Sequence, residues 1–184
     1  MKLSDRLGTA LEYALTFLGI CWVVWLVEFI FGLNFGTLGI YPRTIDGLLG
    51  VITSPFLHGD FQHLLANSIP FGVLCTLLFF FYKEKALFIF ILIWLTSGLL
   101  TWLIGRPAFH IGASGVIYAL ASFLIFGGIL SRKFSLIIAS IAVIVAYSGL
   151  IWGIFPTDGR ISWEGHLAGA ISGFIWAYAF RKAI

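Results

Sequence analysis

The sequence predicts an all-α, polytopic membrane protein whose six transmembrane helices form one bundle. Of its 184 residues, 60% are hydrophobic and 10% are charged, whereas soluble domains carry about a quarter charged residues. A helix needs about 20 predominantly apolar residues to cross the hydrocarbon core. Six continuous stretches meet this need, and they lie near 11–31, 62–82, 86–104, 114–130, 134–155 and 162–180.

The first stretch is expected to remain in the protein as a span. It is longer than the 7–15 apolar residues of a signal peptide, and no small-residue cleavage site follows it. No Pro- or Ser-rich linker, charged extramembrane region or internal repeat interrupts the later stretches. The sequence therefore predicts a single domain over residues 1–184.

The fourth stretch is short for a membrane span. Its 17 residues from 114 to 130 give a helix of about 25 Å, which is less than the roughly 30 Å of hydrocarbon. Ser114 should therefore lie below the outer surface. Residues 105–112 must then descend into the bundle as irregular backbone, which is tolerated only where protein or a water-filled cavity surrounds it.

The basic residues predict the orientation. With the N-terminus inside, the cytoplasmic segments hold Lys2, Arg6, Lys83, Lys85, Arg132, Lys133, Arg181 and Lys182. The outer segments hold Arg43, Arg106 and Arg160. This excess satisfies the positive-inside rule and places both termini in the cytoplasm. Because the basic residues border the spans, they are expected to face membrane lipids, and the charge requires no nucleic-acid partner.

This topology places all four histidines, together with Asn67 and Ser114, near the outer side. A single polar residue inside a membrane is explained equally well by an interhelical hydrogen bond, but ionisable residues there commonly mark a function. Three different helices bring polar groups to one shallow level. The set as a whole therefore favours a functional site that opens to the outer side.

Ser114 and His166 suggest a nucleophile and its general base. Gly169 and Gly173 share a helix face with His166, and small residues at this spacing let membrane helices pack closely. Gly115 is the matching small residue beside Ser114. One turn further along the same helix, the ring of Tyr118 could hold the imidazole in place. A helix-packing motif alone explains the glycines but not the histidine.

His63 and Asn67 are four residues apart, on one face of the second span. They could point at a developing oxyanion beside the backbone N–H of Ser114, and one such donor is typically worth ~3 kcal/mol. A zinc protease would instead need His-Glu-x-x-His, whereas this helix reads His-Leu-Leu-Ala-Asn. We therefore expect no metal and no cofactor.

These residues resemble those of the rhomboid intramembrane serine proteases, across essentially the whole chain and in the minimal six-span form. The resemblance rests on three motifs, His58-x4-His63-x3-Asn67, Gly112-x-Ser114-Gly115-x-x-Tyr118 and Gly165-His166-x-x-Gly169-x-x-x-Gly173. It implies a catalytic dyad without a third acid and an oxyanion site from His63, Asn67 and the Ser114 N–H. It further implies that Tyr118 packs on His166 and that His58 and Gly112 are supporting residues.

The resemblance also implies a substrate class. Members of this family cleave single-span transmembrane proteins near the outer end of the substrate helix. The long outer loop near 32–60 corresponds to the membrane-embedded loop of the family, with Tyr41-Pro42-Arg43 as its aromatic and arginine feature. Trp152 or Phe155 on the fifth span are candidates for the lateral gate, and position 66 on the second span is Ala.

Two other classes fit parts of this pattern. An inactive relative that binds client helices would keep the fold but usually lose the serine or the histidine. A small-solute transporter would explain polar residues in the membrane, but transporter sites lie near the midplane in repeated halves. The compact chain without a transit peptide favours a prokaryotic cell membrane.

Overall fold

The computed structural model describes residues 3–156 and 161–182, and within them the prediction of an all-α fold is confirmed. The long helices are α1 (Leu3–Phe31), α3 (Phe61–Tyr82), α4 (Ala86–Ile104), α5 (Ser114–Ser131), α6 (Phe134–Tyr147) and α7 (Trp163–Phe180). The short elements are α2 (Gly50–Thr53) and the 3-10 helices η1 (Gly36–Leu38), η2 (Asp46–Leu48), η3 (Ser54–Phe56), η4 (Lys83–Lys85) and η5 (Ser148–Ile154).

Several of these helices are long and apolar enough to cross a membrane. Four segments meet both criteria among the described residues, namely Leu3–Phe31, Phe61–Ile104, Ser114–Ser131 and Phe134–Ile154. The second segment holds both α3 and α4. The helix α7 is not among them and carries Glu164 and His166 in its first turns. The protein is therefore an integral membrane protein, and the count of six spans stays a prediction.

Two helix boundaries differ from those expected from the sequence. α1 begins at Leu3 rather than near residue 11, because its polar first turns continue the helix beyond the apolar stretch. The predicted fifth span at 134–155 is divided, since α6 ends at Tyr147 and η5 continues to Ile154. Gly149 and Gly153 lie in this second part, and glycine is the poorest helix former after proline.

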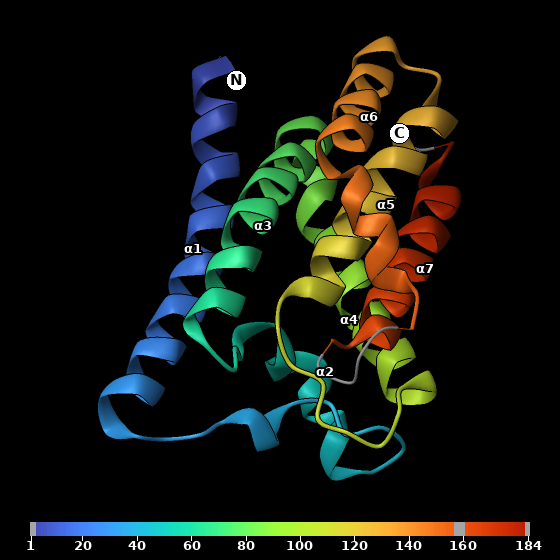
Figure 1. Cartoon of the computed structure of the whole chain (residues 1–184). Coiled ribbons are helices and arrows are strands. Elements are labelled where there is room, and N and C mark those ends of the chain that lie inside the picture. Colours follow the sequence, from blue (N-terminus) through green and yellow to red (C-terminus); the bar gives the residue numbers. More distant parts are fainter. Residues whose placement is uncertain (1–2, 157–160, 183–184) are drawn as a thin grey trace.

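α5 lies at the centre of the bundle and packs against α3, α4, α6 and α7 (Figure 1). Its most extensive contact is with α7, whereas α1 packs mainly on α3 at the edge of the bundle. The core between the helices is filled by large side chains with no exposed surface, among them Leu64, Phe71, Leu74, Leu78 and Phe123. The first residue of α5, Ser114, is thus held by the best-packed helix of the protein.

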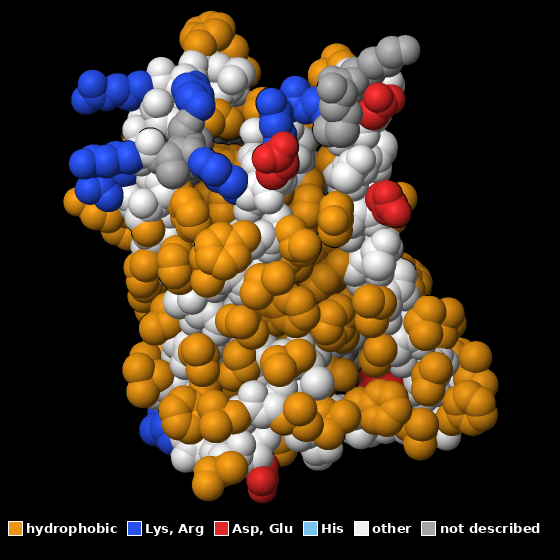
Figure 2. All heavy atoms as spheres, turned by 180° about the vertical axis from the view of Figure 1, so that it is seen from behind, with side chains coloured by type: hydrophobic (Ala, Val, Ile, Leu, Met, Phe, Trp, Pro, Cys, Tyr) orange, Lys and Arg blue, Asp and Glu red, His pale blue; other side chains and the backbone are white. Residues whose placement is uncertain are grey.

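The start of α1 and the end of α7 lie at one end of the bundle, opposite α2 and the loop that contains it (Figure 1). Lys and Arg side chains gather at this end, above a broad band of hydrophobic surface (Figure 2). α1 therefore starts, and α7 ends, at the same end of the bundle. The side of the membrane on which this end lies stays a prediction. Of the basic residues used to predict the orientation, Lys2 and Arg160 lie outside the described residues.

Candidate active site

The structure brings Ser114 and His166 into direct contact. The Ser114 hydroxyl lies 2.9 Å from Nε2 of His166, although the two residues are 52 positions apart. Ser114 is the first residue of α5, so its backbone N–H has no acceptor within the helix. A hydroxyl, an imidazole and an unpaired backbone donor therefore meet at one helix end.

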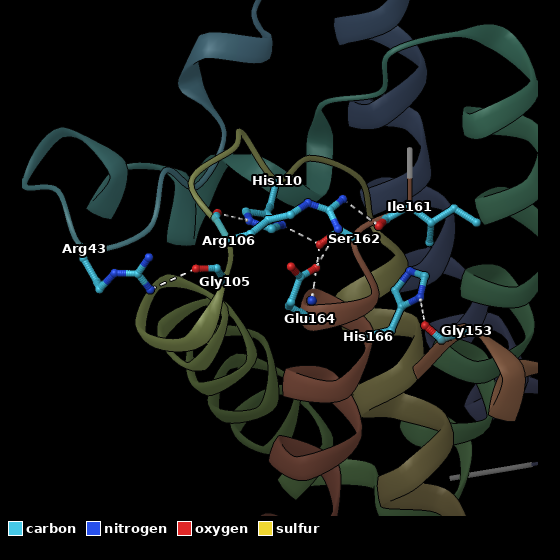
Figure 3. Close-up of polar contacts among 10 residues, drawn as sticks. Arg43, Gly105, Arg106, His110, Gly153, Ile161, Ser162, Glu164 and His166 are labelled. Carbon is cyan, nitrogen blue, oxygen red and sulfur yellow. Dashed lines mark hydrogen bonds and ion pairs between the residues drawn. The ribbon is translucent and has the colours of Figure 1, made fainter. Parts of the chain in front are cut away.

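The other ring nitrogen of His166 fixes the tautomer. Nδ1 lies 2.9 Å from the carbonyl oxygen of Gly153 in η5, and Figure 3 shows the ring turned toward this carbonyl. A carbonyl oxygen can only accept a hydrogen bond, so in the neutral ring Nδ1 carries the proton and Nε2 is left with a lone pair. The Ser114 O–H can donate to that lone pair. The histidine is thus already arranged as a base.

Tyr118 fixes the plane of the imidazole. Its ring stacks on that of His166 with 4.2 Å between the centroids and 9° between the planes. Tyr118 lies one turn beyond Ser114 on α5, so one helix supplies both the hydroxyl and the aromatic surface. Ring rotation away from Ser114 would lose this stacking.

Glycines allow α5 and α7 to approach closely. A Cβ added to Gly169 would collide with the carbonyl oxygen of Gly115, and one added to Gly173 would collide with the carbonyl oxygen of Ala119. The backbones of the two helices are therefore in contact at two successive turns. This packing, which lies further along both helices than the dyad, helps to set the distance between Ser114 and His166.

His63 and Asn67 lie across from the residues that precede Ser114. The Asn67 side-chain amide donates to the His63 carbonyl over 3.1 Å, which leaves its second hydrogen available. Gly112 has a φ of +107°, and a Cβ there would lie 2.6 Å from Nε2 of His63. Only glycine adopts this conformation and fits this space without strain. The loop can thus pass directly over the two polar side chains.

His58 supports the same loop from behind. Its Nε2 accepts a hydrogen bond from the Ala113 N–H over 3.4 Å, and its ring lies 5.0 Å from that of His63. Burial and, secondarily, the neighbouring His63 lower the pKa of His58 to about 4. His58 is therefore neutral at physiological pH and can accept this bond.

These side chains line one cavity of about 560 Å³. Its polar lining includes the five proposed site residues and four further side chains, namely His63, Asn67, Ser114, Tyr118, His166, Asp60, Arg106, His110 and Ser162. Apolar residues complete it, among them Ala66 and Pro70 on α3 and Leu150 on η5. Among the described residues no cluster of His, Cys, Asp and Glu side chains could hold a metal ion. Beside the Ser114 hydroxyl and the His166 imidazole, the cavity offers polar donors and the carboxylate of Asp60.

The outer loop is anchored to the end of α4. The Arg43 guanidinium donates to the carbonyl oxygens of Leu103 and Gly105 over 3.1 and 2.9 Å, and Figure 3 shows the bond to Gly105. The Tyr41 ring packs against that of Phe109 at a centroid distance of 5.0 Å. The Tyr41-Pro42-Arg43 feature thus holds the backbone that leads to the site.

The two aromatic gate candidates lie at the surface of the bundle. Trp152 is 73% exposed and Phe155 is 51% exposed, and neither lines the cavity that holds Ser114. Leu150, from the same segment, does line it. The assignment of gate residues stays a prediction.

The sequence alone did not reveal every group near Ser114. The carbonyl of Gly153 carries no sequence signal, because every residue has one. Glu164 did carry a signal, since a carboxylate two residues before His166 within a predicted span is costly unless it has a partner. The structure supplies that partner in Arg106, whose Nη1 lies 3.5 Å from Oε2 of Glu164.

The fold and the site define an integral membrane protein with a serine and a histidine in contact within a helical bundle. The family model for the rhomboid domain matches residues 46–183, and the chain belongs to the rhomboid family. A protein of Acanthamoeba polyphaga mimivirus, named as a rhomboid protein, is 32% identical over 145 residues, which cover 75% of this chain and 78% of that protein.

Mycobacterial relatives are also similar. An uncharacterized protein of Mycobacterium bovis is 38% identical over 173 residues, covering 89% of this chain and 72% of the relative. One of Mycobacterium leprae is 36% identical over 173 residues, covering 89% and 68%. The family resemblance expected from the three motifs is thereby confirmed.

Proposed function

We propose that this protein is an intramembrane serine endopeptidase that cleaves single-span transmembrane proteins near the outer face of the membrane. The observation that carries the proposal is the 2.9 Å contact between the Ser114 hydroxyl and Nε2 of His166. The Gly153 carbonyl oxygen accepts a hydrogen bond from Nδ1 of His166, so Nε2 is the nitrogen that can accept the Ser114 proton. A serine with an oriented imidazole is the arrangement required for nucleophilic catalysis.

In the first half of the reaction, His166 Nε2 takes the Ser114 proton while the serine oxygen attacks the scissile carbonyl carbon. The negative charge on the carbonyl oxygen is stabilised by the Ser114 N–H and by the side chains of His63 and Asn67. The C–N bond then breaks, and His166 gives its proton to the leaving amine. The product is an ester between Ser114 and the acyl part of the substrate.

In the second half, water replaces the amine. His166 Nε2 removes a proton from the water as its oxygen attacks the ester carbon, and the same donors stabilise the second oxyanion. The ester bond breaks, the proton returns to the Ser114 oxygen, and the carboxylic acid leaves. The cavity of about 560 Å³ beside Ser114 provides space for this water.

The cavity also suggests how a substrate enters. Its apolar wall includes Ala66 on α3 and Leu150 on η5, so a substrate helix from the lipid would approach between these two elements. Residues 1–184 act as one domain in this proposal, in a prokaryotic cell membrane with both termini in the cytoplasm. The partners are transmembrane substrates and membrane lipids.

The test is reconstitution with a panel of single-span substrates. Wild type is expected to cleave at least one of them near its outer end, as mapped by mass spectrometry, and Ser114→Ala is expected to be inactive. Ser131→Ala, at the opposite end of α5, is the matched control and should cleave like wild type. Cleavage by Ser114→Ala at the wild-type rate would refute the proposal.

Fluorophosphonate labelling gives a second readout that needs no substrate. An activated serine is expected to react, and Ser114→Ala should lose the label. A wild-type protein that bound client helices but neither labelled nor cleaved would be an inactive member of the family.

A further inference from the structure

A polar cluster lies beside the dyad and joins two segments that are distant in the sequence. Its members are Arg106 and His110, from the loop before α5, and Ser162 and Glu164, at the start of α7 (Figure 3). We call these four residues the outer clasp. The reaction proposed above uses none of their side chains.

Arg106 connects the loop to the start of α7, and its contacts there include Ile161 and Glu164. Its Nη2 donates to the carbonyl oxygen of Ile161 over 2.9 Å, and its Nη1 lies 3.5 Å from Oε2 of Glu164. Glu164 is only 3% exposed, and a buried carboxylate is costly unless it is paired. Its place in the first turn of α7 also puts its charge near the positive end of the helix dipole. Among the described residues, the buried Oε2 has no hydrogen-bond partner, so the charge of Arg106 compensates it as an ion pair.

His110 provides the second connection. Its Nε2 lies 3.1 Å from the Arg106 carbonyl oxygen, so this nitrogen carries the proton in the neutral ring. Its Nδ1 then accepts from the Ser162 hydroxyl. The Ser162 oxygen in turn accepts from the Gly165 N–H over 3.2 Å and caps α7. One hydroxyl thus joins the loop to the first turn of the helix.

The clasp is close in sequence to both members of the dyad. His110 precedes Ser114 by four residues and is held in place by a two-residue bridge to Ile40. Glu164 precedes His166 by two residues. The glycines of α5 and α7 set the helix separation from the inner side, and the clasp joins the same two segments from the outer side. A displacement of about 1 Å at reacting atoms can cost about 10²-fold in rate.

We propose that the outer clasp positions His166 against Ser114, and that its residues act on kcat rather than on substrate binding. This inference rests on the proposed protease function, because it concerns the same dyad. These four are positioning residues, which act through the backbone on either side of the reacting atoms. Arg106, His110 and Ser162 also line the cavity beside Ser114, whereas Glu164 does not, so Glu164 tests positioning apart from contact with the substrate.

The first test compares Glu164→Gln with wild type in the reconstituted cleavage assay. Glu164→Gln keeps the side-chain shape but removes the charge that faces Arg106. We expect kcat to fall about tenfold, with KM within about twofold of wild type, as for an interaction that affects only the reaction step. The rate of fluorophosphonate labelling should fall by a similar factor. Glu84→Gln, an exposed carboxylate in η4, is the matched control and should change neither rate.

The second test separates positioning from folding. Ser162→Ala removes the hydroxyl that joins His110 to α7, whereas Ser162→Thr retains it. We expect Ser162→Ala to label slowly and Ser162→Thr to recover most of the wild-type rate, with rates expressed per folded molecule after size-exclusion chromatography. The double variant Arg106→Gln/Glu164→Gln should lose no more than the worse single variant, because both singles break the same contact.

The outcomes distinguish the two proposals. A wild-type protein that neither labels nor cleaves would refute the protease function, and the positioning role with it. An active wild type together with unchanged kcat and labelling in folded Glu164→Gln and Ser162→Ala would overturn the clasp alone. The positioning role would also be overturned if the losses of kcat in the Arg106→Gln/Glu164→Gln variant were additive, or if the single variants changed only KM.

Discussion

The carbonyl oxygen of Gly153 accepts a hydrogen bond from Nδ1 of His166 over 2.9 Å. In Ser-His-Asp hydrolases a carboxylate takes this position, where it selects the tautomer and stabilises the imidazolium that forms. A backbone carbonyl selects the same tautomer but brings a dipole instead of a full charge. The orientation of the base therefore depends on η5, a 3-10 segment rather than a regular helix.

Gly153→Ala is expected to impair activity by displacing the base. A Cβ at this position would collide with the Tyr118 hydroxyl and lie 3.0 Å from Nδ1 of His166, so the stacked ring pair has to move. We expect kcat to fall at least tenfold in the reconstituted assay. Gly149→Ala lies in the same 3-10 segment with nothing within 4 Å of its added Cβ. If both variants lost activity equally, the specific contact would not be the cause.

Gly112→Ala is expected to disturb the oxyanion site. The added Cβ would lie 2.6 Å from Nε2 of His63, and the φ of +107° is strained for any residue with a Cβ, at about 1–3 kcal/mol. We expect a loss of kcat together with a lower unfolding temperature. Gly32→Ala has a φ of +63° with open space around it, so it should lower stability without changing kcat. Equal kcat values for the two variants would argue against the role given to His63.

Gly169→Ala is expected to destabilise the protein by forcing α5 and α7 apart. Its Cβ would collide with the Gly115 carbonyl oxygen, a rigid backbone atom, and overpacking of this kind typically costs about 1–3 kcal/mol. The unfolding temperature in detergent measures this loss. Gly19→Ala in α1, where nothing lies within 4 Å, should be as stable as wild type or slightly more so. A wild-type unfolding temperature for Gly169→Ala would show that the helices are not in such close contact.

The stability of the protein is expected to fall in acid, partly through His58. Burial lowers the pKa of this side chain to about 4, against about 6.5 in an unfolded chain. Between these values the unfolded state binds a proton that the folded state does not. Stability is therefore full above pH 6.5 and is lost as the pH falls toward 4, by about 3 kcal/mol from this residue.

Unfolding temperatures at pH 7.5, 6 and 5 would measure this effect. His58→Gln should show a shallower decline with pH than wild type, because it lacks the titrating group. Burial also lowers the pKa of His110, so some decline should persist in the variant. The same slope in both proteins would exclude a contribution from His58.

Much of the architecture could be predicted from the sequence, because continuous apolar stretches of this length have few alternatives to a membrane helix. The shortness of the fourth stretch likewise predicts that Ser114 lies below the outer surface, and this depth stays a prediction. The 3-10 segment after α6 was not predicted, because hydropathy does not distinguish between two helix types. Gly149 and Gly153 were the sequence signal for it, since glycine is a poor helix former. The packing of Gly169 on Gly115 was expected from spacing alone.

The contacts around the dyad were predicted less completely. Helix periodicity placed Tyr118 one turn from Ser114, and the family resemblance implied that its ring packs on His166. The bond to Gly153 and the pairing of Arg106 with Glu164 depend on how three loops meet at one end of the bundle. Irregular backbone has no period from which such contacts could be calculated.

The antiparallel bridge between Ile40 and His110 has a consequence for the order of events during synthesis. His110, in the segment before α5, pairs with Ile40, which is synthesised much earlier. His166 is synthesised later, as part of α7. A chain that has inserted α5 but not α7 has its serine without its base. In the proposed protease, the contact between Ser114 and His166 can therefore form only after α7 has joined the bundle.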